Sequence, residues 1–434
     1  MKNIWLWNHY ATEMYRNHGG RHYWFAEHLN MHGYKATIFC ANTYHNRATW
    51  VETGRKKFVT DTVNGIPFVF VKTTPAIDNG IARVKNMFLF FKNLLSVANS
   101  YAKVNSKPDI ILASSVHPLT MVAGILIAKR FQIPCICEVR DLWPEAIFAF
   151  NKAKEKSLLG KLLTYGEYWI YKRADALIFT KEGDIDYIIE KGWDTSHGGK
   201  IDLGKCHYIN NGVNLEAFTE SMRDKVNDAD LEDGKFNVVY TGAIRPVNNV
   251  GNILDAAALL KEQTDIRILI YGDGNQLEFL KQRVLDEGLI NVRLKGYVEK
   301  CHIPYILSKS SVNILNYSQS QYNWSRGNSS NKLFEYMASG KPIISTVKMG
   351  YCILEKYRCG FSLAEATPTE LAKAILKVRD MTKADYEELA SNARKAAEDF
   401  DFRVLTQQLI DVVQDLLGVD QIKKHEISNE VPYA

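Results

Sequence analysis

The chain has 434 residues, which is too long for one compact core and suits two domains. Of these residues 46% are hydrophobic and 24% charged, as is ordinary for a soluble globular protein. Its longest apolar run, Leu119–Ala128, is too short to span a membrane, and no secretory signal is seen, so we expect a cytoplasmic protein. Seven scattered cysteines without a Cys-x-x-Cys pair argue against a disulfide framework or a structural zinc site.

The net charge of +5 is unevenly distributed along the chain. Residues 1–205 carry a net charge of +9, and the remaining residues carry −4. This asymmetry predicts different partners for the two halves. Because no dense Lys/Arg stripe with interleaved aromatic residues occurs, we expect no nucleic-acid partner.

The first half alternates strands with helices, a rhythm typical of a parallel sheet covered by helices. A strand at Ile4–Trp7 is followed by a Gly19-Gly20 loop and a helix over 21–32. A further helix is predicted over 119–131. The other predicted strands are Ala36–Cys40, Pro67–Val71, Ile110–Ala113, Pro134–Val139 and Ala176–Thr180.

The second half repeats this rhythm. Its predicted strands are Asn237–Tyr240, Arg267–Tyr271, Val292–Leu294, Ser311–Leu315 and Pro342–Ser345, with helices over 250–260, 275–287 and 331–339. Two such sets predict an α/β protein of two doubly wound domains, and the acidic stretch 219–235 is the best candidate linker. Apolar spacing over 402–417 predicts a final helix, and the polar tail 420–434 is expected to fray.

Ligands of parallel sheets bind beyond the carboxyl ends of the strands, so polar residues there are the candidates for a site. In the first half these are Gly20, His117, Arg140 and Asp141. Paired glycines opening a helix let backbone N–H groups approach a phosphate, and a histidine there can contact a hydroxyl or a proton. The alternatives are a plain turn, a histidine that caps the next helix, and an Arg140 that only pairs with Glu138 or Asp141.

In the second half, Arg245 follows a glycine turn, where a guanidinium suits a diphosphate. A helix then begins after Gly327 with small polar residues and an early lysine, a pattern that offers open N–H groups to phosphate oxygens. Glu335 lies one turn further, where it could take two ribose hydroxyls. A surface arginine and a capped amphipathic helix are the alternatives. The residues at the start of this helix are Ser329, Ser330, Asn331 and Lys332.

The segment 83–103 is basic and amphipathic. No acidic residue occurs between Asp78 and Asp109, while five lysines and arginines do. Val84, Met87, Phe88, Phe91, Leu94, Leu95, Ala98 and Tyr101 share one helical face. Such a helix can lie on an anionic bilayer at the inner face of the cell membrane, and the alternative is a helix packed on the sheet.

These segments together resemble family 4 of the retaining glycosyltransferases, which have the GT-B fold of two Rossmann-like domains facing each other across a cleft. Val139–Pro144 and Lys332–Tyr336 resemble in particular the subgroup that builds O-antigen, capsule or exopolysaccharide. The matching pieces occur in the family's order: the Gly19-Gly20 loop, Glu138–Pro144, Ile209–Asn214, Tyr240–Gly242, Gly272–Gly274 and Lys332–Pro342.

The resemblance implies an acceptor-side domain over 1–215, with the helix 402–418 crossing back to it, and a nucleotide-sugar domain over 216–401. Glu335 would bind the ribose, and the backbone around Gly272 and Tyr297 would hold the base. His117, Arg140 and Asp141 would line the sugar and acceptor side as catalytic residues. The diphosphate would be held by Gly20, Arg245, Ser329, Ser330, Asn331 and Lys332.

Two positions depart from the family pattern. Many members have Glu eight residues before the ribose-binding Glu, where this chain has Gly327. Many also have a lysine shortly after the phosphate-binding arginine, where Asn248 and Asn249 stand. Fewer cations would then face the diphosphate, which would make Lys332 more important.

The implied reaction moves a hexosyl or N-acetylhexosaminyl group from a nucleotide sugar, with a leaning to UDP, onto a glycan or lipid-linked acceptor. Configuration would be retained, and the leaving phosphate would help to deprotonate the acceptor. We expect no metal and no cofactor. A non-hydrolysing nucleotide-sugar 2-epimerase and a non-catalytic GT-B partner subunit are the alternatives.

Overall fold

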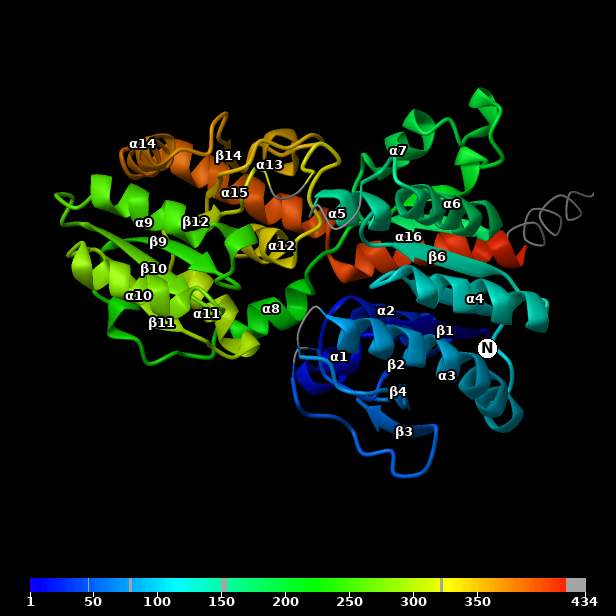
Figure 1. Cartoon of the computed structure of the whole chain (residues 1–434). Coiled ribbons are helices and arrows are strands. Elements are labelled where there is room, and N and C mark those ends of the chain that lie inside the picture. Colours follow the sequence, from blue (N-terminus) through cyan, green and yellow to red (C-terminus); the bar gives the residue numbers. More distant parts are fainter. Residues whose placement is uncertain (46, 78–79, 150–153, 321–322, 419–434) are drawn as a thin grey trace, which may run out of the picture. The chain divides into compact units, whose positions relative to one another are not determined.

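The computed structural model describes residues 1–45, 47–77, 80–149, 154–320 and 323–418, and it contains two α/β units (Figure 1). The first unit comprises residues 1–210 and the segment from Phe402 onward. The second unit comprises Asn211–Asp401. The two doubly wound sets predicted from the sequence are therefore confirmed as the fold of the chain.

The first unit is built on an eight-stranded sheet in the order β3-β4-β2-β1-β5-β6-β7-β8. Every neighbouring pair is parallel except β3 and β4. These two form a hairpin through Asn64-Gly65, both at positive φ, which is the two-residue turn that right-twisted strands favour. The strands are β1 Asn3–Trp7, β2 Lys35–Ala41, β3 Phe58–Val63, β4 Ile66–Val71, β5 Ile110–Ser114, β6 Cys135–Val139, β7 Ala176–Phe179 and β8 Cys206–Tyr208.

Helices cover both faces of this sheet because its central strands are apolar on both sides. One core contains Trp5, Trp7 and Phe39 with residues of α3, α4 and α6, and the other contains Ile4 and Leu6 with residues of α2 and α16. The helices are α1 Thr12–Asn17, α2 Arg21–Met31, α3 Ile81–Asn105, α4 Pro118–Phe131, α5 Trp143–Ala149, α6 Leu158–Arg173, α7 Asp184–Glu190 and α16 Phe402–Leu417, with short turns η1 Thr195–His197 and η2 Leu203–Lys205.

The second unit has a six-stranded parallel sheet in the order β11-β10-β9-β12-β13-β14. Its strands are β9 Phe236–Thr241, β10 Ile266–Tyr271, β11 Val292–Gly296, β12 Val312–Leu315, β13 Ile343–Ser345 and β14 Gly360–Ser362. Its helices are α8 Leu215–Ser221, α9 Val250–Leu259, α10 Leu277–Asp286, α11 Ile303–Ser308, α12 Asn331–Ala338, α13 Ile353–Lys356, α14 Pro368–Arg379 and α15 Lys383–Asp399, with short turns η3 Ala229–Leu231, η4 Pro246–Asn248 and η5 Lys300–His302.

The composition of the acidic stretch 219–235 predicted a linker between the units, and this prediction is wrong. The stretch lies inside the second unit, where the carboxylates of Asp228 and Asp230 each accept a hydrogen bond from Lys295 Nζ at 2.6 Å. Leu231, which follows them, is buried in the core of this unit. Asp228, Asp230 and Asp233 therefore pair with Arg267 and Lys295 of the sheet.

The amphipathic helix α3 is divided between core and surface. Leu94, Ala98 and Tyr101 pack in the core, whereas Val84 and Phe88 are 66% and 58% exposed. The apolar face predicted from the sequence is therefore packed against the core over its second half and left exposed at Val84 and Phe88. Among the described residues, no helix combines the length and apolar character that crossing a membrane requires.

Candidate functional site

A buried charge network fixes the loops at the carboxyl edge of the first sheet. The carboxylate of Glu138 in β6 accepts hydrogen bonds from Arg21 Nε at 2.7 Å, His22 Nε2 at 2.9 Å and Ser114 Oγ at 2.6 Å. Burial by itself raises the pKa of Glu138, but Arg21 and His22 hold it well below its usual range. The partner of Glu138 is thus Arg21, and not Arg140 as the sequence alternative had it.

Gly20 precedes this arginine and occupies the N-cap position of α2. Its φ of 114° lies in the region that favours glycine, and an added Cβ would lie 3.0 Å from Met14 Cγ. No side chain caps the start of α2, so its first turn keeps open N–H groups. This geometry suits an anion, and the diphosphate role of Gly20 stays a prediction.

Arg140 and Asp141 follow β6 at the same edge of the sheet. The backbone N–H of Arg140 donates to Ser115 Oγ at 2.9 Å, and its guanidinium forms no ion pair within the described part of the chain. The Asp141 side chain is 51% exposed, with Oδ1 3.8 Å from Lys181 Nζ. The Arg140 guanidinium therefore remains available to a ligand.

His117, after β5, is buried and pairs with a second histidine. Its Nε2 lies 2.6 Å from His9 Nδ1, and burial lowers the pKa of His117 to about 3. Its side chain does not cap α4, so the capping alternative is wrong. A neutral imidazole at neutral pH can bind a hydroxyl but is too weak a base to take its proton.

In the second unit, two glycines bring the loops after β9 and β10 into backbone contact. A Cβ on Gly272 would lie 1.8 Å from Gly242 O, and one on Gly242 would lie 2.9 Å from Lys332 Nζ. Their φ values are 149° and 144°. A side chain at Gly272 would collide with backbone, and the φ of Gly242 is one that side chains rarely adopt, so glycine is needed at both positions.

Lys332, in the first turn of α12, inserts its ammonium group between two tyrosine rings. Nζ lies 4.5 Å from the ring centroid of Tyr240 and 4.6 Å from that of Tyr317, and it donates to Tyr240 Oη at 3.2 Å. No carboxylate within the described chain lies within ion-pair distance of it. Burial lowers the pKa of Lys332 to about 7, an effect that Glu335 only partly opposes. Neither tyrosine was predicted as a site residue, although Tyr240 belongs to a piece that resembles the family and both lie at or just beyond strand ends.

The start of α12 is open to an anion. Ser330 occupies the cap position, but its side chain accepts no capping hydrogen bond, so the capped-helix alternative is wrong. The backbone N–H of Ser330 donates to Asn328 Oδ1 at 2.7 Å, and Asn211 Nδ2 donates to Ser329 O. Asn331 is exposed. The loop is thus held by asparagines while the helix end, with its partial positive charge, stays unneutralised.

Arg245 is exposed and forms no ion pair within the described residues. The two asparagines that replace the family's lysine have structural roles. Their carbonyls accept hydrogen bonds from Asn316 Nδ2, at 2.6 Å for Asn248 and 2.8 Å for Asn249. Asn249 has a φ of 48°, which an asparagine tolerates better than most residues.

The predicted nucleoside-binding residues are partly occupied by protein contacts. Glu335 Oε1 lies 3.5 Å from Lys300 Nζ, and Tyr297 is 57% exposed with its hydroxyl donating to Glu299 Oε2 at 3.1 Å. Lys300 is itself more than half exposed, so its pair with Glu335 is weak. A ribose could therefore displace Lys300 at little cost in free energy.

Gly327 stands where many family members have a glutamate, and its backbone conformation disfavours any side chain. Its φ is 103°, and a Cβ there would meet no atom closer than 3.6 Å. The obstacle to a side chain is thus backbone strain rather than crowding.

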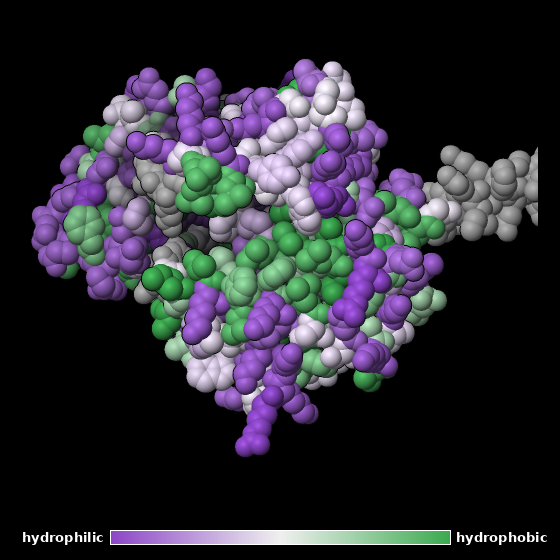
Figure 2. All heavy atoms as spheres, turned by 45° about the vertical axis from the view of Figure 1, so that its right-hand side comes forward, coloured by the Kyte–Doolittle hydropathy of each residue, from purple (hydrophilic) through white to green (hydrophobic). Residues whose placement is uncertain are grey.

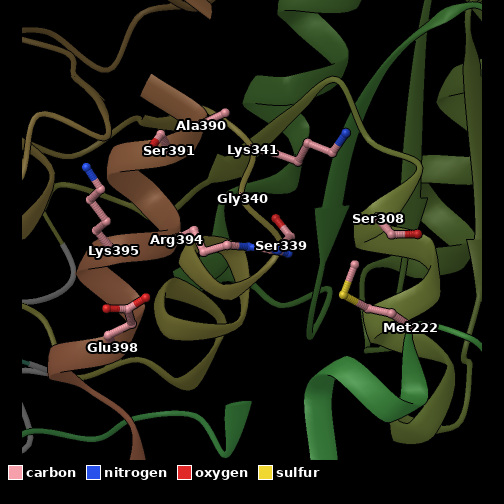
Figure 3. Close-up of a pocket in the computed structure, with 10 residues that line it drawn as sticks. All are labelled: Met222, Ser308, Ser339, Gly340, Lys341, Ala390, Ser391, Arg394, Lys395 and Glu398. Atoms are coloured by element: carbon pink, nitrogen blue, oxygen red, sulfur yellow. The ribbon is translucent and has the colours of Figure 1, made fainter. Parts of the chain in front are cut away.

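A hollow of about 530 Å³ lies elsewhere in the second unit, beyond the carboxyl end of α12 (Figure 3). Lys341 and Lys395 point away from each other, while Arg394 lies near Ser339. Because these cations do not converge, the hollow is a poor anion site. No group of three or more metal-ligating side chains occurs in the described ranges.

Two protein families match the chain, one in each half. Residues 20–197 match the family described as "Glycosyl transferase 4-like domain", and residues 221–396 match "Glycosyl transferases group 1". The glycosyltransferase TuaH of Bacillus subtilis (strain 168), named for teichuronic acid biosynthesis, is 26% identical over 216 residues. That match covers 49% of this chain and about half of the relative, 50% of its length.

Solved structures of the same fold cover nearly the whole chain. The Anabaena protein Alr3699/HepE, crystallised with UDP, has a TM-score of 0.66 at 16% identity and covers 96% of this chain and 100% of its own. The α,α-trehalose 6-phosphate synthase of Burkholderia multivorans has a TM-score of 0.70 at 12% identity, over 96% of this chain and 99% of its own. At these identities the likeness establishes the fold.

Proposed function

Because the chain belongs to the family 4 glycosyltransferases of the GT-B fold, we propose that it transfers a sugar from a UDP-sugar to a glycan or lipid-linked acceptor during surface polysaccharide synthesis. The TuaH relative supports the pathway class, and the Anabaena structure with UDP supports the nucleotide. Both matching families are glycosyltransferases, which favours transfer over epimerisation.

The observation that carries this proposal is the ammonium group of Lys332. An ammonium group taken out of water without a carboxylate partner is unfavourable in the unliganded protein, and its contacts with the two aromatic rings offset only part of that cost. Lys332 lies in the first turn of a helix that also offers open N–H groups. A diphosphate would neutralise the Lys332 ammonium and the partial positive charge at the start of α12. The free protein therefore already holds the positive groups that a diphosphate would pair with.

The expected chemistry follows from these charges. As the bond between the sugar and the diphosphate breaks, negative charge grows on the phosphate oxygens, where Lys332, Arg245 and the start of α12 would stabilise it. One preorganised donor of this kind is worth about 2.7–4 kcal/mol, or about 10²–10³ in kcat.

The acceptor's proton needs a base, and His117 is too weak a base for this task. The leaving phosphate would take the proton on the face from which it departs, so configuration at the anomeric carbon is retained. Neutral His117 and the carboxylate of Asp141 would orient hydroxyl groups. We propose that no metal takes part, so dialysis against EDTA leaves the rate unchanged.

Lys332→Met tests the proposal, with Lys341→Met as a matched control. Both lysines are partly buried in the second unit and have lowered pKa values, but Lys341 lies beyond the other end of α12. UDP should raise the melting temperature of the wild type and of Lys341→Met, but not of Lys332→Met. Equal shifts in all three would contradict the assignment of the site.

Turnover separates an enzyme from a scaffold or an epimerase. The wild type should release UDP from a UDP-sugar in the presence of acceptor, and Arg245→Ala and Lys332→Met should not. Release of the 2-epimer of the sugar without an acceptor would identify an epimerase. UDP binding without any turnover would identify a non-catalytic subunit.

A further inference from the structure

Helix α6 has two apolar faces, and only one of them packs in the core. The inner face contributes Ile170 and Tyr171 to the core of the first unit. The opposite face carries a row of apolar side chains, which we call the outer stripe: Leu158, Leu162, Tyr165 and Trp169. The first three are 86%, 65% and 65% exposed, and the fourth is half-buried. Single exposed apolar residues are ordinary, whereas a row of them along one helix marks an interaction surface.

The outer stripe has the spacing that a helix presents to another helix. Its members follow one another after four, three and four residues. This alternation is that of the apolar seam of a coiled coil, in which side chains of one helix insert between those of the facing helix. The exposure of the stripe shows that none of the described elements of the chain occupies the facing position.

The apolar surface extends from the outer stripe to the neighbouring helices. Leu159 of α6 is 53% exposed, and Leu162 lines a hollow of about 940 Å³ together with Val84 of α3. Helix α4 packs against both α3 and α6 (Figure 1). Figure 2 shows hydrophobic side chains gathered over α3 and α4. The stripe is thus part of a larger apolar area, of a kind that proteins use to bind a partner.

The outer stripe matches itself when a second copy of the chain is turned end for end. Separations of four, three and four residues read the same from either end of the helix. In an antiparallel pair of α6 helices, Leu158 lies opposite Trp169 of the second copy, and Leu162 lies opposite its Tyr165. Such a contact uses one patch on both subunits, which is the arrangement of two-fold dimers. It also places the positive N-terminus of each helix beside the negative C-terminus of the other.

Charges at the two ends of the stripe obey the same symmetry. Glu155, which precedes α6, is exposed and lines a hollow of about 380 Å³ beside Tyr168. Lys172, also exposed, lies one turn beyond Tyr168 on the same side of the helix. A two-fold axis at the middle of the stripe therefore brings Glu155 of one copy to Lys172 of the other, at both ends of the contact.

The other charges nearby are compatible with this pairing. Glu155 pairs with Lys191 of its own chain, but a carboxylate can accept from a second ammonium group as well. Lys172 forms no ion pair within the part of the chain that the structure describes. Lys161 flanks the stripe in both copies and is exposed, so water and salt screen its repulsion. An anionic bilayer would attract the lysines but would repel Glu155 at the edge of the stripe.

We propose that the chain forms a two-fold dimer in which the outer stripe of α6 packs antiparallel against the same stripe of a second copy. The contact uses the first unit, whereas Lys332 and Arg245, which are proposed to hold the diphosphate, belong to the second unit. The inference therefore goes beyond the proposed function and is tested without a sugar donor.

Sedimentation velocity over a wide range of protein concentration tests the dimer. The wild type should reach twice the chain mass of 49.4 kDa as its concentration rises. Leu162→Gln combined with Tyr165→Ser should raise the dissociation constant at least about tenfold, because the contact loses its two central apolar pairs. Leu285→Gln, at a leucine 72% exposed in α10, is the matched control and should dimerise like the wild type. Because all these side chains are exposed, none of the substitutions should unfold the monomer.

A charge exchange tests the direction of the pairing. Glu155→Lys should weaken dimerisation because it places like charges at both ends of the contact, and Lys172→Glu should do the same. The chain with both substitutions regains an opposite pair at each end and should dimerise about as well as the wild type. Within one chain the two positions lie at opposite ends of α6, so this recovery requires a second copy. The lost pair with Lys191 affects the single and the double variant alike.

A wild type that sediments as a monomer at every concentration would overturn the inference. So would a dimer that Leu162→Gln with Tyr165→Ser leaves equally stable, or a charge exchange without recovery. Flotation of a monomeric wild type, but not of that double variant, with phosphatidylglycerol vesicles would assign the stripe to a bilayer instead. UDP should stabilise the wild type and these variants equally, so failure of the donor site and failure of the dimer are seen separately.

Discussion

Replacing Lys332 by Met should stabilise the folded protein while it abolishes UDP binding. The wild type buries most of an ammonium group between two rings without a counter-charge, and its pKa falls from 10.5 to about 7. At about 1.36 kcal/mol per pKa unit, holding the charged form in the fold costs at most about 5 kcal/mol. Because the side chain keeps some contact with solvent, we expect Met to recover about 2–4 kcal/mol of this.

The pH dependence of this gain has a definite sign. Below pH 7 the lysine is protonated in both the folded and unfolded states, so the wild type carries the full cost. Between pH 7 and 10.5 the unfolded chain holds a proton that the folded chain has released, so wild-type stability rises with pH. The advantage of Lys332→Met should therefore be largest near pH 6 and shrink toward pH 10.

Urea unfolding of both proteins at pH 6, 8 and 9.5, with and without UDP, measures this advantage. Lys348→Met, at an exposed lysine of the same unit, should change the free energy of unfolding by less than about 0.5 kcal/mol at any of these pH values. A destabilised Lys332→Met, or one whose difference from the wild type does not vary with pH, would refute the view of Lys332 as an uncompensated buried cation.

Three further outcomes follow from the geometry. UDP affinity, measured calorimetrically, should fall as pH rises from 7 to 9, because Lys332 must be protonated to bind the diphosphate. Lys332→Arg should remove this pH dependence. If the affinity of the wild type does not change between pH 7 and 9, the assigned role of Lys332 is wrong. Arg21→Met should lower the free energy of unfolding by about 3–5 kcal/mol in urea titrations, since it strands the buried Glu138 carboxylate, whereas a loss below about 1 kcal/mol would mean that His22 suffices. Gly327→Ala should destabilise by about 1–2 kcal/mol through its positive φ, seen as a lower melting temperature; an unchanged melting temperature would show that the loop relaxes.

Local patterns were enough to predict the two sheets and the strand ends at which the candidate residues lie. Short apolar runs such as Ile110–Ala113 and Ile266–Tyr271 predict buried strands from residues that are adjacent in the chain. The β3–β4 hairpin was missed although Asn64-Gly65 is a strong turn signal, because its strand Phe58–Val63 is polar and half exposed.

Which side chains meet across the fold was decided by the tertiary structure. Glu138 pairs with Arg21, 117 residues away, and Lys332 reaches the hydroxyl of Tyr240, 92 residues away, and neither separation leaves a trace in local periodicity. Which face of α6 stays exposed was likewise decided by how that helix packs in the first unit. Strand and helix patterns reflect interactions within a few residues of chain, whereas charge pairing and exposure depend on packing between segments that the sequence separates.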